Sequence, residues 1–201
     1  MITEENGVFH IRTETYSYLF KIDAYGLAEH LHFGVPVKTR DADALSCRPG
    51  LGWGTGILLD PKDTASCPDV LPLEWSGSGR GDYRESPLEL AGEPGDFRYT
   101  GYKIHEGGVP MACGLPQAHD APETLEITLR QPGAELTLFY TAFPTAIVRR
   151  TVLANTGDKP LRLNKLMSSC VDLPGSYTMA TFNGGWIAEM RRAGRWCPSG
   201  R

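Results

Sequence analysis

The sequence predicts an all-β fold in which two antiparallel sheets pack face to face as a β-sandwich, with few or no helices. First, 23 glycines and 15 prolines interrupt the 201 residues at short intervals and leave few windows long enough for an ordinary helix. Second, apolar and polar residues alternate in TLEITLR (residues 124–130), which is the pattern of a half-buried strand. Third, turn residues separate many short segments of this kind, which favours a sandwich over a parallel α/β fold.

Three short segments near the N-terminus predict a β-meander. They are FHIRTE (9–14), SYLFKID (17–23) and LAEHLHF (27–33). An Ala-Tyr-Gly turn around Tyr25 separates the last two segments, as expected between neighbouring antiparallel strands.

A long ordered loop is predicted at about residues 41–80, where the alternation disappears. The segment is rich in Gly, Pro and Asp, but it also contains Trp53, Trp75 and several leucines. Loops of this length are usually functional or disordered, and a solvated linker has little use for large apolar side chains. We therefore expect the loop to pack on the sandwich, and we expect a binding site there first.

The strand pattern returns after the loop and continues almost to the C-terminus. The predicted strands are SPLELA (86–91), DFRYTGYKIHEG (96–107), TLEITLR, AELTLFYTAF (134–143) and two more within residues 146–173, with hairpin-turn residues at Asn155–Asp158. Residues 125–173 should form one antiparallel sheet. The predicted domain spans residues 1–190, and the arginine-rich residues 191–201 are expected to be a poorly ordered tail.

Composition and charge argue against several classes of protein. With 24 acidic and 20 basic residues and no basic stripe, the chain offers no electrostatic footprint for nucleic acid. Acidic residues near the N-terminus and the lack of a long apolar run predict a cytoplasmic protein with no membrane partner. The five cysteines form no CxxC spacing, which favours reduced thiols. No cofactor is implied.

The histidines and carboxylates of the sequence are candidates for a metal site or a catalytic site, but their spacing is not specific for either. His30 and His32 are expected to lie on one face of a strand, but no third ligand follows at a telling spacing, so no metal site is predicted. Glu74, Asp82 and Glu85 flank the long loop, and glycoside hydrolysis needs two opposed carboxyl groups. Their abundance does not distinguish a catalytic pair from surface acids.

The loop tryptophans allow two interpretations. Trp53 and Trp75 could stack on the apolar face of a sugar, or they could pin the loop to the sandwich. The neighbouring tripeptide Arg80-Gly81-Asp82 matches an adhesion signal, but a charged turn before a strand explains it better in a protein without a secretion signal.

Several ordered motifs resemble one family. The pattern of a glutamate, an aromatic residue and Gly-x-x-Asp-aromatic-Arg occurs at Glu74, Trp75, Gly79, Asp82, Tyr83 and Arg84. Asp-aromatic-Arg-Tyr occurs at residues 96–99 and includes Arg98, Gly-Leu-Pro at residues 114–116, and Glu-Thr-Leu-Glu-Ile at residues 123–127. Over residues 5–190 the chain resembles the N-terminal domain of the bacterial α-galactosidases of glycoside hydrolase family 36. Glu74, Asp82, Tyr83, Arg84 and Arg98 are expected to be structural members of these motifs.

The resemblance implies a large sandwich of the galactose mutarotase type that precedes a (β/α)₈ barrel. In that family two aspartates in the barrel perform retaining hydrolysis of terminal α-galactosyl residues in sugars such as melibiose and raffinose. A barrel needs about 250 residues, so we expect no barrel here, no catalytic residue, and no activity of the chain alone. By position in the family loop, Trp53, Asp69 and Trp75 are candidates for lining the galactoside site of the complete enzyme.

The resemblance also implies a homo-oligomer, and we expect the sandwich to expose an apolar patch. Two other functions remain open. One is a free-standing carbohydrate-binding module that uses the loop tryptophans. The other is a mutarotase-like epimerase, which would need a histidine and a carboxylate that converge on one concave face. The candidate histidines are His30, His32, His105 and His119, and none has a recognisable partner in the sequence.

Overall fold

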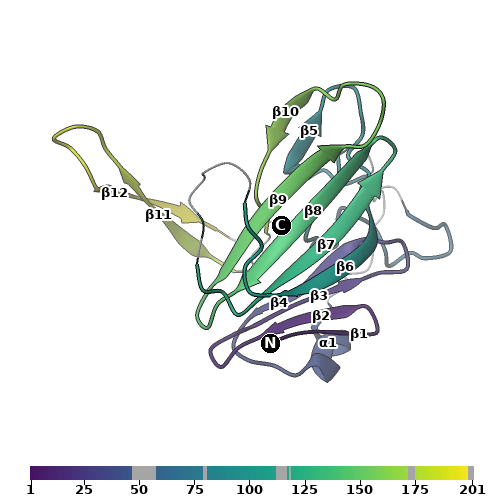
Figure 1. Cartoon of the computed structure of the whole chain (residues 1–201), viewed down its shortest axis with the longest axis horizontal. Helices are drawn as coiled ribbons and strands as arrows, with labels where there is room; N and C mark the ends of the chain where they lie inside the picture. The colour runs from purple at the N-terminus through teal and green to yellow at the C-terminus, as the bar shows by residue number, and fades with distance from the viewer. Residues whose placement is uncertain (47–57, 79–80, 112–116, 118, 172–174, 199–201) are drawn as a thin grey trace. The chain divides into compact units, whose positions relative to one another are not determined.

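Two antiparallel four-stranded sheets form most of the first of two compact units, Met1–Val171 (Figure 1). The computed structural model describes residues 1–46, 58–78, 81–111, 117, 119–171 and 175–198. Strands dominate these residues, and α1 (Ala42–Leu45) has only four residues. The prediction of an all-β sandwich with few helices is therefore confirmed.

The first sheet is a meander in which each strand pairs with the next. Its strands are β1 (Ile2–Glu5), β2 (Val8–Arg12), β3 (Ser17–Ile22) and β4 (Ala28–Gly34). Asn6 and Gly7 close the first hairpin with positive φ angles of 54° and 81°, which a two-residue turn of this kind requires. The last three strands overlap the predicted segments, with Val8 and Gly34 just outside them. The strand β1 was missed because it is short and contains two glutamates.

The second sheet is also a meander. Its strands are β6 (Arg98–Glu106), β7 (Glu123–Gln131), β8 (Ala134–Ala142) and β9 (Ile147–Asn155). All four lie at predicted positions. Ile127 is paired with Leu138 in an unbroken register between β7 and β8, which places the alternating apolar residues of both strands on one face.

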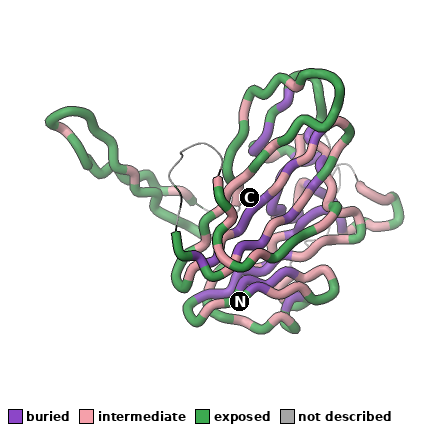
Figure 2. The backbone as a smooth tube through the Cα atoms, in the orientation of Figure 1, coloured by how far each residue is buried: buried purple, intermediate pink, exposed green. Residues whose placement is uncertain are grey.

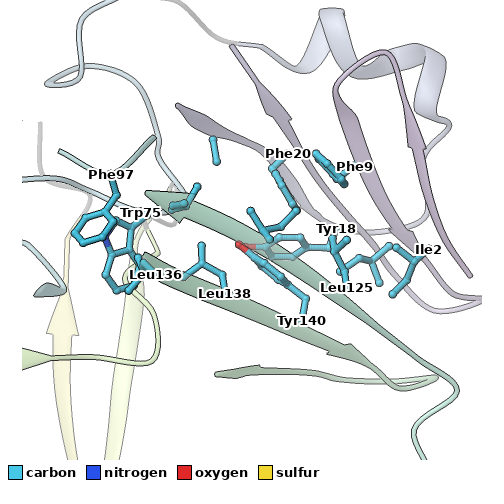
Figure 3. Close-up of a cluster of buried hydrophobic side chains, with 14 of the residues drawn as sticks. Ile2, Phe9, Tyr18, Phe20, Trp75, Phe97, Leu125, Leu136, Leu138 and Tyr140 are labelled. Carbon is cyan, nitrogen blue, oxygen red and sulfur yellow. The ribbon is translucent and has the colours of Figure 1, made fainter. Parts of the chain in front are cut away.

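The core lies between the two sheets (Figure 3). The second sheet contributes six large apolar or aromatic side chains that are at most 2% exposed: Leu125, Ile127, Leu129, Leu136, Leu138 and Tyr140. The first sheet contributes Phe9 and Phe20, whose rings stack with centroids 4.9 Å apart. Each fully buried side chain of this size contributes about 1.5–3 kcal/mol of transfer free energy, so this interface provides most of the hydrophobic stabilisation.

One predicted pairing is wrong. The turn at Asn155–Asp158 was expected to return the chain along β9, but β10 (Leu163–Leu166) pairs instead with β5 (Leu88–Leu90). Asn155 does form a turn, because its side chain accepts a hydrogen bond from the Gly157 N–H at 3.0 Å. Pro160 then follows, and a proline has no N–H to continue the ladder with β9.

A second cluster covers the outer side of the first sheet. The 3₁₀ helix η1 (Thr39–Asp41) and α1 follow β4, and Ala42 of α1 packs with Leu19 and Leu31. His10, which is 2% exposed, joins η1 to the sheet through hydrogen bonds to Thr39 and Ser17, both 2.9 Å long.

The second compact unit, Asp172–Arg201, contains a hairpin of β11 (Tyr177–Asn183) and β12 (Arg191–Cys197). The residues of β12 were expected to belong to a poorly ordered tail, but the structure gives them a regular antiparallel pairing with β11. This strand contains three arginines and is exposed at six of its seven residues, so it has no apolar alternation by which the sequence could reveal it. Most side chains of the hairpin are exposed (Figure 2). In the described part of the chain, no helix has the length and hydropathy needed to cross a membrane.

Candidate functional site

Two residues of the long loop, Ser46 and Leu73, are attached to the same strand, β4. At its start, the Ser46 hydroxyl donates a hydrogen bond of 2.8 Å to the fully buried carboxylate of Glu29. At its end, Leu73 forms an antiparallel bridge with Glu29. Ser46 and Leu73 are therefore both attached to the edge strand of the first sheet.

Glu74, at the end of the loop, is a buried carboxylate that connects both sheets. It accepts hydrogen bonds from Tyr18 of β3 at 2.8 Å and from Tyr140 of β8 at 2.7 Å. His30 Nδ1 of β4 lies 2.6 Å from one carboxylate oxygen, and Arg149 Nη2 of β9 lies 3.3 Å from the other. The Arg149 guanidinium also lies 4.7 Å from the centre of the Tyr140 ring. Four strands thus converge on one side chain.

The partners keep Glu74 ionised. Burial alone raises the pKa of a carboxyl group, but the Arg149 charge and the hydrogen bonds from His30 and Tyr140 outweigh it, so the pKa of Glu74 lies below its ordinary value. Burial raises the pKa of both Tyr18 and Tyr140 well above the usual value, which keeps the phenols protonated as donors. The site is therefore a satisfied structural network.

Asp82 and Arg84 form a second ion pair beside the loop. Arg84 Nε donates to Asp82 Oδ1 at 2.9 Å, and Arg84 Nη2 donates to Asp82 Oδ2 at 2.8 Å. The same Nη2 atom donates to the carbonyl oxygen of Pro68 at 2.9 Å. Glu85, by contrast, is exposed and pairs with Lys165. Of the three carboxylates that flank the loop, Glu74 and Asp82 are buried in ion pairs, so they are not a free catalytic pair across a cleft.

Arg98 belongs to the same motif cluster. It pairs with Asp96 at 2.7 Å and donates to the Tyr25 carbonyl oxygen at 3.1 Å. A cavity of about 20 Å³ lies among the motif residues, and its lining includes Trp75, Asp82, Phe97 and Arg98. A space of this size is enough for one water molecule, but it is far too small for a sugar.

The three predicted sugar-site residues have different environments. Trp75 is 5% exposed and packs in the core between the sheets, near Phe97 (Figure 3). This burial favours the pinning role over sugar stacking. Asp69 is half-buried, and its carboxylate makes no hydrogen bond or ion pair with the described residues. Trp53 lies outside the described residues. Tyr83 of the motif is 75% exposed.

The expectation that His30 and His32 share a face is wrong. A register shift in β3–β4 pairs His30 with Phe20, which points into the core, and His32 with Leu19, which lies in the outer cluster. The two imidazoles therefore lie on opposite sides of the sheet. Among the described residues no group of three or more His, Cys, Asp or Glu side chains could hold a metal ion.

Two features escaped the sequence analysis. His105 Nε2 of β6 lies 2.7 Å from Glu126 Oε2 of β7, and only the cross-strand register brings them together. These two groups contact each other, and neither lines the two cavities described here. A larger cavity of about 390 Å³ lies at one end of the sandwich, and its polar lining includes Arg12, Glu14 and Glu123.

The two four-stranded sheets and their shared core define an antiparallel β-sandwich domain. AgaA, an α-galactosidase of Geobacillus stearothermophilus, is 31% identical over 90% of this chain and 26% of its own length. The crystal structure of AgaB from the same organism, a family 36 α-galactosidase, superimposes with a TM-score of 0.84 at 27% identity, over 97% of this chain and 28% of AgaB. An AgaA variant in complex with raffinose gives a TM-score of 0.82 at 28% identity, over 96% of this chain and 28% of that structure.

The family pattern for the glycosyl hydrolase family 36 N-terminal domain matches residues 26–201. The chain belongs to this family, as its motifs predicted. It spans about a quarter of the length of the curated relatives that it matches.

Proposed function

We propose that this chain is the non-catalytic β-sandwich domain of a retaining α-galactosidase. The complete enzyme removes terminal α-D-galactosyl residues from oligosaccharides such as melibiose and raffinose. The observation that carries the proposal is the family match over residues 26–201 combined with a span of only 26% of AgaA. The engagement of Glu74 and Asp82 in buried ion pairs supports a role other than catalysis.

In this proposal the domain fixes one part of the substrate rim. The two contacts with β4 hold the long loop, and Asp69 offers a carboxylate that accepts hydrogen bonds from sugar hydroxyl groups. Trp53 is assigned to the same rim from the family resemblance. The domain also contributes contacts between subunits of a cytoplasmic homo-oligomer, for which its exposed apolar side chains are suited.

The first test is catalytic. The purified 201-residue chain is incubated with p-nitrophenyl α-D-galactopyranoside, and release of nitrophenol is followed. We expect no rate above that of the buffer, because the chain has no free pair of carboxylates among the candidates. Turnover that survives repurification and is lost on substitution of a residue of this chain contradicts the proposal.

The second test concerns the rim. Raffinose is titrated into the ¹⁵N-labelled chain, and the amide signal of Asp69 is followed with an expected dissociation constant on the order of millimolar for so few contacts. Asp69→Asn should abolish the shift. Asp158→Asn, which changes an exposed carboxylate in a turn, is the matched control and should leave it unchanged.

A further inference from the structure

Asp69 occupies a short turn whose two ends are buried. The Val70 N–H donates to the Cys67 carbonyl oxygen at 3.1 Å, and the Leu71 N–H approaches the same oxygen at 3.3 Å. Cys67 and Leu71 are both 0% exposed, whereas Asp69 between them is half-buried. The turn therefore presents one carboxylate from a backbone that is anchored on either side.

The Arg84 side chain, from the motif Gly81–Ser86, reaches this turn through a hydrogen bond. Arg84 Nη2 donates to the Pro68 carbonyl oxygen, directly before Asp69, at 2.9 Å. The Asp82 carboxylate, which is 1% exposed, holds the guanidinium through two further bonds of 2.9 and 2.8 Å. Asp82 Oδ1 also accepts the Arg84 backbone N–H at 3.1 Å. The bonds to Asp82 therefore fix the position and the orientation of the guanidinium that contacts the turn.

We propose that Arg84, held by Asp82, is a positioning residue that orients the turn at residues 67–70 so that the Asp69 carboxylate faces the hydroxyl groups of a galactoside. This inference rests on the proposed function and assigns a role to a motif that otherwise has only a structural one. Arg84 acts through the backbone of Pro68 and does not contact the sugar.

The chemistry of the guanidinium explains the residue types. Arginine presents several donors in a rigid plane, so one side chain can grip a carboxylate with two bonds and still donate to a carbonyl oxygen. A lysine keeps the charge but cannot hold this geometry. A turn that is fixed before the ligand arrives loses less entropy on binding, and small shifts of a hydrogen-bonding group reduce affinity strongly.

The positioning step is tested without sugar by amide hydrogen exchange of the full chain. Arg84→Lys and Asp82→Asn should accelerate exchange at Val70 and Leu71 by about tenfold or more, because a charge-assisted contact to the turn is lost. Amides of β7 and β8 should not change. Tyr83→Phe is the matched control, since Tyr83 lies between the pair and is 75% exposed. Unchanged exchange at Val70 and Leu71 in Arg84→Lys overturns the inference.

The link to the sugar is tested by titrating raffinose into the same variants. Arg84→Lys should weaken the response of the Asp69 amide by about tenfold, even though the charge is retained. Ser86→Ala removes hydrogen bonds elsewhere in the same motif and should leave the response intact, which separates positioning from general loss of stability. A normal response in Arg84→Lys together with a lost response in Asp69→Asn overturns the inference.

Failure of the proposed function gives a different result. If the wild-type Asp69 amide does not respond to raffinose, or if Asp69→Asn responds normally, the sugar role of Asp69 and the inference that depends on it are both contradicted. The exchange data then still report whether Arg84 holds the turn.

Discussion

Glu74 shows how a buried charge is accommodated in this fold. Moving an isolated carboxylate out of water is costly, and the cost is offset only when the partners are close and complete. Here Arg149 supplies the opposite charge, while Tyr18, Tyr140 and His30 supply the hydrogen bonds. Such a network favours one folded structure over other compact ones, because only the correct packing of both sheets and the loop brings all partners of Glu74 together.

Glu74→Gln should destabilise the chain by about 3–5 kcal/mol, because it leaves the buried Arg149 without its counter-charge. Equilibrium unfolding in urea measures this difference. Glu93→Gln is the control, since Glu93 is exposed and should change stability by less than about 0.5 kcal/mol. Equal stabilities for the two variants would show that Arg149 finds another partner.

Stability should also depend on pH through Glu74. Its pKa lies below the ordinary value of 4.5, so in acid the unfolded chain binds this proton more readily than the folded chain does. The stabilisation is therefore complete above pH 4.5 and is lost as the pH falls through the lower pKa of the folded state. Urea midpoints measured between pH 3 and pH 7 should fall on the acid side, and Glu74→Gln should make that slope shallower. An identical slope would assign the acid sensitivity to other carboxyl groups.

At the scale of single elements, the β7–β8 hairpin depends on one backbone conformation. Its two-residue turn consists of Pro132 and Gly133, and Gly133 has a φ angle of 78°. Proline followed by glycine suits such a turn, because proline fixes the first φ angle and glycine accepts a positive one.

Gly133→Ala should therefore cost about 1–2 kcal/mol, since an L-residue with a side chain is strained at a positive φ. Among the described residues, no atom beyond the two chain neighbours lies within 4 Å of the added methyl group, so the cost reports conformation. Gly101→Ala is the matched control, because Gly101 also has open space but no positive φ. Thermal unfolding compares the two variants. Equal losses would point to packing or strand effects rather than to the turn.

The strands were predictable wherever the apolar alternation was strong, as in β7 and β8. The pairing of strands was harder to predict, because β10 follows Pro160 and pairs with β5 instead of β9. The faces of single residues were also harder to predict, because a register shift places His30 and His32 on opposite sides of the sheet. For the site, the sequence identified Asp82 and Arg84 as motif residues. It could not show the Pro68 contact, because a backbone carbonyl 16 positions away leaves no mark in a residue pattern.

At the scale of the whole molecule, the second unit exposes an unusual amount of apolar surface. Its large side chains with at least 47% exposure are Tyr177, Met179, Phe182, Trp186, Ile187, Met190 and Trp196. A two-stranded hairpin is marginally stable on its own in water, and contiguous apolar surface favours association.

The chain should consequently self-associate as its concentration rises. Sedimentation velocity from micromolar to submillimolar concentration measures this tendency. The double variant Phe182→Ser with Trp186→Ser should shift the distribution towards the monomer, because it removes two rings that are 60% and 89% exposed. Tyr83→Ser removes an equally exposed ring from the first unit and is the control. A wild-type chain that stays monomeric throughout this range would contradict the expectation.

The attachment of the long loop to β4 has an evolutionary consequence. Ser46 donates a hydrogen bond to the Glu29 side chain, and Leu73 forms a backbone bridge with the same residue. These two positions of the loop are therefore attached to the sandwich at one residue. Lengthening a loop whose ends are already held together costs little, about 0.6 kcal/mol for each doubling. Variants of this fold can therefore differ in the residues between these two contacts while they keep the same scaffold.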